Sequence, residues 1–142
     1  MKLFGHPVHI MLIHFPAALF PMDLVCSGIS FFTSDDSFTM ASFYAGAGGI
    51  TVGWLAMIFG TWDLLRLYKT RQDAMSPALI HGGINSIVVI VFTILVLMRY
   101  LEFPDIKADR MGIVFLKATC AAMMLFGNFI GGQLILKYKV VE

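Results

Sequence analysis

Four apolar stretches divide this sequence, each long enough to cross a membrane. They cover residues 7–32, 41–67, 77–100 and 111–136, and a helix needs about 20 residues to span the hydrocarbon core. The chain has 142 residues, of which 58% are hydrophobic and only 13% charged. A water-soluble domain of this size could not bury so much apolar surface. The sequence therefore predicts an integral membrane protein that contacts the lipid bilayer.

Short polar segments connect these stretches, at residues 33–37, 69–73 and 102–110. Such short connections place successive helices antiparallel. We therefore expect an all-α protein, an antiparallel bundle of four transmembrane helices forming a single domain over residues 1–142. His14 and Pro16 interrupt the first stretch, and no small-residue cleavage motif follows it. We interpret it as a retained first helix rather than a signal peptide.

The basic residues predict how the bundle is oriented. Six of them fall on the side of the two chain ends and four on the other side: Lys2, Arg66, Lys69, Arg71, Lys137 and Lys139, against Arg99, Lys107, Arg110 and Lys117. The positive-inside rule then makes both termini cytoplasmic, with a bacterial inner membrane as the expected location. A net charge of +1 gives no reason to expect a nucleic-acid partner.

The predicted topology gathers the histidines in one half of the bundle. His9 and His14 lie near the start of the first helix, His81 near the start of the third, and Asp63 near the end of the second. From the helical rise, His14 lies roughly 10 Å and His81 roughly 6 Å from their helix starts. Ionisable groups inside a membrane commonly mark functional sites. We expect His14 and His81 to share a site with Asp63 at the same level, and His6 to stay at the interface.

Other polar and small residues allow more than one interpretation. Asp63 is also placed to pair with Arg66, one turn along the same helix. Gly60, Gly127 and Gly131 fall toward the histidine end. Glycines there either let helices approach closely or make room for a planar ligand. Asp23 lies deep in the first helix, and its partner is not predicted.

The opening run GHPVHIMLIHFPAAL, at residues 5–19, resembles the start of a known family. Bacterial membrane proteins grouped as domain-of-unknown-function family 2231 begin with a run similar to HPxHPxLVHFPIAL. Ile10 stands where the family usually has a second proline. Shorter similarities follow at residues 60–63, at 81–85 and at 131–132. The motif residues that the resemblance carries over are His9, His14, Asp63, His81 and Asn85. Relatives fused to Rieske or cytochrome c-like domains imply a redox setting.

The leading hypothesis for function is a membrane electron carrier that binds b-type haem. Two histidines on facing helices suit the axial positions of haem iron. His14 and His81 are the expected pair, with His9 as a substitute or as the ligand of a second site. Asn85 is one turn beyond His81 and is placed to orient a ligand, and Arg66 with Lys69 to neutralise propionates. A redox protein or other membrane partner, or a second copy in a homodimer, is expected.

Two other hypotheses remain open from the sequence. His9, His14, His81 and Asp63 offer three imidazoles and a carboxylate, which suffice for a non-haem ion of zinc, iron or copper. Alternatively, the chain is a structural or assembly subunit of a membrane complex, or a small transporter whose histidines line a path. No arrangement of a nucleophile with a catalytic base emerges, so a subunit or carrier is expected rather than a stand-alone enzyme.

Overall fold

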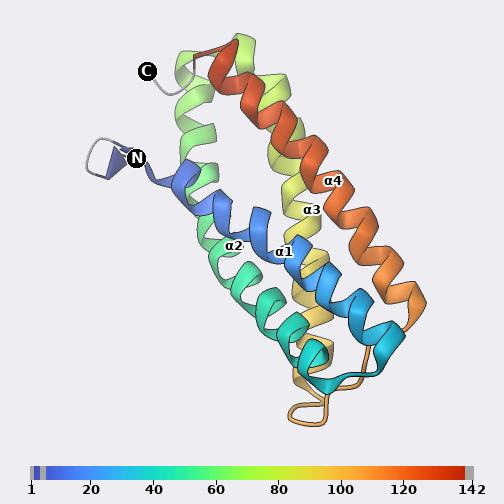
Figure 1. Cartoon of the computed structure of the whole chain (residues 1–142). Coiled ribbons are helices and arrows are strands. Elements are labelled where there is room, and N and C mark those ends of the chain that lie inside the picture. Colours follow the sequence, from blue (N-terminus) through green and yellow to red (C-terminus); the bar gives the residue numbers. More distant parts are fainter. Residues whose placement is uncertain (1, 4–5, 140–142) are drawn as a thin grey trace.

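The computed structural model contains four long helices arranged as an antiparallel bundle (Figure 1). It describes residues 2–3 and 6–139, with the backbone alone described at residues 2, 3, 6 and 7. The helices are α1 (Val8–Thr33), α2 (Asp36–Thr70), α3 (Met75–Tyr100) and α4 (Met111–Leu136). A 3₁₀ turn, η1 (Gln72–Ala74), precedes α3, and two-residue strands β1 (Lys2–Leu3) and β2 (His6–Pro7) pair before α1. The predicted all-helical membrane bundle is confirmed.

The helix boundaries follow the predicted stretches closely, with one clear difference at the start of α2. This helix begins at Asp36, whereas the sequence predicted a connection over residues 33–37 because they are polar. Asp35 is the N-cap, and its carboxylate accepts a hydrogen bond of 2.8 Å from the backbone N–H of Ser37. Short polar side chains at a helix start satisfy N–H groups that lack a helical partner. The polar segment therefore caps the start of α2 and does not form a long connection between α1 and α2.

The start of α1 and the end of α4 lie at one end of the bundle, which we call the terminal end (Figure 1). The connection of residues 101–110 lies at the other end, which we call the loop end. All four long helices have the length and composition needed to cross a membrane. The starts of α1 and α3 and the ends of α2 and α4 thus meet at the terminal end, as the sequence predicted.

An apolar layer occupies the middle of the bundle. The rings of Phe20 on α1 and Phe92 on α3 stack with their centroids 4.0 Å apart, and both side chains are fully buried. Val88, Cys120 and Met124 complete this layer. Along α1 the layer falls between His9 and Asp23, and along α3 between His81 and Arg99. It therefore separates two polar regions, one at each end of the protein.

Candidate functional site

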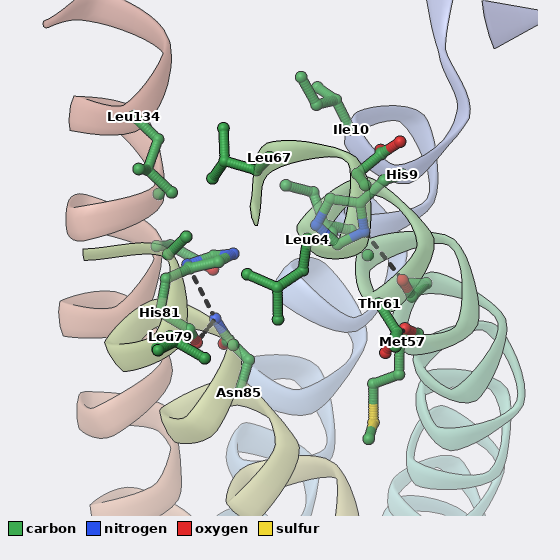
Figure 2. A pocket seen from close by; sticks show the side chains of 18 of the residues that line it. His9, Ile10, Met57, Thr61, Leu64, Leu67, Leu79, His81, Asn85 and Leu134 are labelled. Atoms are coloured by element: carbon green, nitrogen blue, oxygen red, sulfur yellow. Dashed lines mark hydrogen bonds between the residues drawn. The ribbon is translucent and has the colours of Figure 1, made fainter. Parts of the chain in front are cut away.

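Two histidine rings face each other at the terminal end of the bundle. His9 comes from the first turn of α1 and His81 from the second turn of α3. Their ring centroids are 6.3 Å apart, and the ring planes are nearly perpendicular at 80°. Figure 2 shows the two side chains on opposite sides of one pocket. Because α1 and α3 both start at this end, the topology brings the two imidazoles to the same depth.

Each imidazole is anchored to a backbone carbonyl of the neighbouring helix. The Nδ1 of His9 lies 2.8 Å from the Ala56 oxygen on α2, and the Nδ1 of His81 lies 2.7 Å from the Gly127 oxygen on α4. A carbonyl oxygen can only accept, so each Nδ1 carries the proton and donates it. The Nε2 of each neutral ring then keeps its lone pair. Metal-binding histidines are commonly oriented by such a bond from the other ring nitrogen.

Glycines provide the surfaces on which these rings lie. A Cβ added at Gly60 would come within 2.8 Å of the Cε1 of His9, and one added at Gly131 within 2.6 Å of the Cε1 of His81. Gly127 plays the same part for Asn85, whose Nδ2 would be 3.0 Å from an added Cβ. These glycines therefore do more than let helices pack closely, because they leave the space that the histidine and asparagine side chains fill.

Asn85 lies one helical turn after His81 and contacts it. Its Nδ2 donates to the backbone oxygen of His81 at 3.0 Å and lies 3.2 Å from the His81 Nδ1. Asn85 also lines the pocket (Figure 2). Because the His81 Nδ1 donates to Gly127, both Nδ1 and the Asn85 Nδ2 are donors, and the role of Asn85 in orienting a ligand stays a prediction.

The two rings open into a large pocket between the helices, with a volume of about 1000 Å³. Its deeper wall, toward the apolar layer, is made by Gly53, Val89 and Met124. At the terminal end its wall contains charged side chains, namely Asp63, Arg66, Arg71 and Lys139. Ligand sites in proteins are typically apolar cavities of about 300–1000 Å³ with a few placed polar groups. The pocket has the size and character of such a site.

The structure pairs His81 with His9, not with His14 as the sequence suggested. His14 lines the same pocket, but its ring is exposed and its Nδ1 lies 2.7 Å from the Ile10 oxygen of its own helix. Five residues turn the helix by about 140°, so His9 and His14 leave α1 on different sides. The side chain of His6 lies outside the described part of the chain.

The other predicted site residues divide between the pocket and the surface. Asp63 and Arg66 line the pocket, whereas Lys69 lies outside it, in a separate shallow groove that Arg66 also borders. Among the residues that the structure describes, no three His, Cys, Asp or Glu side chains form a group able to hold a metal ion.

The comparison with protein families agrees with the opening motif. Residues 5–142 match the family described as predicted membrane protein (DUF2231). The chain belongs to this family. No curated protein and no solved structure matches it. The match includes both histidines, their carbonyl anchors and their glycines, so the whole site lies within the part shared with the family.

The two helical hairpins of this DUF2231 protein repeat one arrangement. In α1–α2, His9 binds the carbonyl of Ala56 and lies on Gly60, four residues further on. In α3–α4, His81 binds the carbonyl of Gly127 and lies on Gly131, again four residues further on. Phe20 follows His9 by eleven residues, and its stacking partner Phe92 follows His81 by eleven. Matching residues meet each other, as in a two-fold relation between repeats.

A second polar group, which sequence reasoning missed, lies at the loop end. The ammonium of Lys117 on α4 is 1% exposed and lies 2.6 Å from the Asp23 Oδ1 and 2.6 Å from the Asp109 Oδ2. Asp23 is on α1, and Asp109 is in the connection before α4. Two mid-helix charges in apolar stretches, Asp23 and Lys117, were the signal available in the sequence.

Arg99, Ser42 and Ser27 complete this group and connect it to the remaining helices. Arg99 on α3 donates to the Ser42 Oγ of α2 at 2.8 Å and lies 3.4 Å from the Asp109 Oδ2. Ser27 on α1 donates to the same Asp109 oxygen at 2.6 Å, and Ser42 donates to Asp23. We call these six residues the ionic cluster. With two acidic and two basic side chains, it is neutral and joins all four helices.

The carboxyl group of Asp109 is expected to make the stability of the protein depend on pH in the acidic range. Burial alone would raise its pKa, but the charge of Lys117, with hydrogen bonds from Lys117 and Ser27, lowers the pKa below its ordinary value of 3.8. A pKa lower in the folded than in the unfolded state adds stability above 3.8, which is lost as the pH falls through the folded pKa. We expect the thermal unfolding temperature of the detergent-solubilised protein to fall below about pH 4.

The matched comparison uses two aspartates of one connection. Asp109→Asn should lower the unfolding temperature at pH 7 and reduce its decline in acid, whereas the exposed Asp105→Asn should change neither. Equal behaviour of the two variants would contradict this assignment.

Proposed function

We propose that this protein is a membrane redox protein that binds a b-type haem between His9 and His81 and passes electrons to or from a partner. The observation that carries the proposal is the pair of facing imidazoles, each anchored through Nδ1 to a backbone carbonyl. His9 and His81 would hold the iron through their Nε2 atoms, which remain available because each Nδ1 is bound to a backbone carbonyl.

The number of available protein ligands favours haem over a non-haem ion. A zinc site needs at least three protein ligands, and the described residues form no such group. Haem iron needs only one or two, because the porphyrin supplies the other four. The pocket also offers the apolar walls that a porphyrin requires. This comparison supports haem b over the alternative of zinc, iron or copper bound by His9, His14, His81 and Asp63.

Two histidines that would both bind the iron favour electron transfer over oxygen chemistry. When bound, the haem would supply one-electron exchange. The protein's own contribution is to hold the ligands: the carbonyls of Ala56 and Gly127 fix the two rings, and Asn85 supports His81. With the terminal end cytoplasmic in a bacterial inner membrane, an electron-transfer partner would bind on that side.

Absorption spectroscopy of the purified full-length protein tests this proposal. After expression with added haem, the reduced-minus-oxidised spectrum should show the bands of a low-spin haem with two histidine ligands. His9→Ala and His81→Ala should each lower haem affinity at least tenfold or convert the spectrum to high spin. His14→Ala is the matched control and should retain the wild-type spectrum, since its ring does not face His81.

Two results would contradict the proposal. One is a protein without a Soret band that binds no added haem. The other is haem binding that neither His9→Ala nor His81→Ala weakens. Elemental analysis distinguishes the non-haem alternative, which requires near-stoichiometric metal without porphyrin absorbance.

A further inference from the structure

The charged side chains of the pocket are arranged unevenly along the bundle. Those that line it are Asp63, Arg66, Arg71 and Lys139, three basic groups against one acidic group. All four belong to the last turns of α2 or to the segments that follow α2 and α4. They therefore surround the terminal end of the pocket, where three of these four described charges are positive.

The opposite end of the same pocket has an apolar floor, and the polar residues Asn85, Ser86 and Asn128 lie about one turn nearer the histidines. Gly53, Val89 and Met124 form its wall, and beyond them lies the stacked pair Phe20 and Phe92. A charged group of a ligand directed toward this end would lose its hydration without meeting an opposite charge among the described lining residues, which is costly. The pocket thus accepts a molecule with an apolar body and a charged edge, and it fixes which way that molecule points.

The repeated arrangement of the two hairpins constrains the ligand further. His9 and His81 are matching residues of α1 and α3, and so are Phe20 and Phe92 (Figure 2 shows the two histidines). The two-fold axis that relates the two hairpins therefore passes between the two histidines and between the two phenylalanines, and it runs along the bundle. A flat molecule contacted on its two faces by the two histidines lies along this axis, with one edge toward the basic residues.

We infer that the ligand held between His9 and His81 is a flat dicarboxylate amphiphile whose two carboxylates bind Arg66, Arg71 and Lys139 at the terminal end. This inference rests on the proposed haem site and adds the direction in which its acidic edge points. The two negative charges of such a ligand would meet three basic side chains, of which Arg71 is paired with Asp73.

Arg71 is able to take part at little cost. It forms an ion pair with Asp73 at 3.0 Å, in which the two side chains are 43% and 56% exposed. An ion pair as exposed as this contributes little to stability. Arg71 can therefore readily exchange Asp73 for a ligand carboxylate, which can bind the guanidinium through two oxygens.

The test compares haem b with its dimethyl ester, in which both carboxylates are neutral while the ring and iron are unchanged. Binding of each compound to the purified protein in detergent is followed by Soret absorbance. We expect the ester to bind about tenfold more weakly to the wild-type protein. The double variant Arg66→Gln with Lys139→Gln should weaken haem binding by a similar factor and bring the two affinities together.

Lys69→Gln serves as the matched control. Lys69 borders the outer groove but not the pocket, whereas Arg66 borders both. Lys69→Gln removes one positive charge from the same end of the protein, where the double variant removes two, and the tenfold preference for haem over its ester should remain.

The outcomes separate the two proposals. If haem and the ester bind equally to the wild-type protein, and both need His9 and His81, the haem site stands and the inference on its acidic edge is overturned. If Lys69→Gln abolishes the preference as fully as the pocket variants, a general surface charge is responsible and the inference also fails. If neither compound shows histidine-dependent binding, the proposed function itself is wrong.

Discussion

Replacing Lys117 with methionine is expected to lower the free energy of unfolding by about 3–5 kcal/mol. The ammonium of this residue is 1% exposed and lies between the carboxylates of Asp23 and Asp109, at 2.6 Å from each. Methionine has a similar length but no charge, so the variant leaves a buried carboxylate of Asp23 without its cation. Removing one partner of a buried pair costs much more than the pair itself contributes to stability.

Thermal or denaturant-induced unfolding of the detergent-solubilised protein measures this effect. Lys107→Met, in the exposed connection before α4, is the matched control and should change stability by less than about 0.5 kcal/mol. Adding Asp23→Leu to Lys117→Met should recover most of the loss, because Asp109 still has Arg99 and Ser27 as partners. A Lys117→Met variant as stable as the wild type would contradict the structural role of the ionic cluster.

The ionic cluster and the pocket give the two ends of the bundle different roles. The terminal end contains a pocket of about 1000 Å³, so its helices have fewer side chains in contact there. At the loop end, Asp23, Arg99 and Lys117 connect α1, α3 and α4 through charged hydrogen bonds. A fixed loop end can hold the helix directions while the terminal end stays open for a ligand.

The sequence was sufficient to predict the helices because apolar length and short polar connections determine them directly. The predicted fourth stretch, residues 111–136, coincides with α4 (Met111–Leu136). The start of α2 was missed because Asp35 is polar both as a loop residue and as a helix cap. Which of these applies depends on whether its carboxylate binds the N–H of Ser37, and composition alone does not show this.

The candidate site was predicted at the level of topology but not of rotation. Counting helices places His9, His14 and His81 in one half of the bundle, as found. Whether His9 or His14 faces His81 depends on the rotation of α1 about its own axis. This rotation follows from the packing of α1 against α2. The contact between His9 and Gly60 settles that rotation, and it involves residues far apart in the sequence.

The ionic cluster and the repeated hairpins were harder to infer for a related reason. Asp23 and Lys117 are isolated charges in two apolar stretches, and several pairings were open to each of them. The repeat leaves a faint trace in the sequence, since an aromatic residue follows His9 and His81 by the same eleven residues. Two shared positions identify a repeat only when the structure shows Phe20 and Phe92 in contact.

In the proposed haem site, Gly131→Ala is expected to weaken haem binding by about 10- to 100-fold, the range seen when a residue supporting a metal ligand is altered. The added Cβ would lie 2.6 Å from the Cε1 and 2.7 Å from the Nδ1 of His81, so the ring must move. That movement breaks the bond from Nδ1 to the Gly127 oxygen. Gly132→Ala is the matched control, because an added Cβ there meets nothing within 4 Å.

Both substitutions replace glycine with alanine on the same turn of α4, so the gain in helix propensity, up to about 1 kcal/mol, is common to both. A difference in haem affinity between them therefore reports the space beside His81 and not the stability of the helix. Gly60→Ala should reproduce the loss through His9, since an added Cβ would lie 2.8 Å from its Cε1. Equal haem affinities for the Gly131→Ala and Gly132→Ala proteins would show that the position of the His81 ring does not control binding.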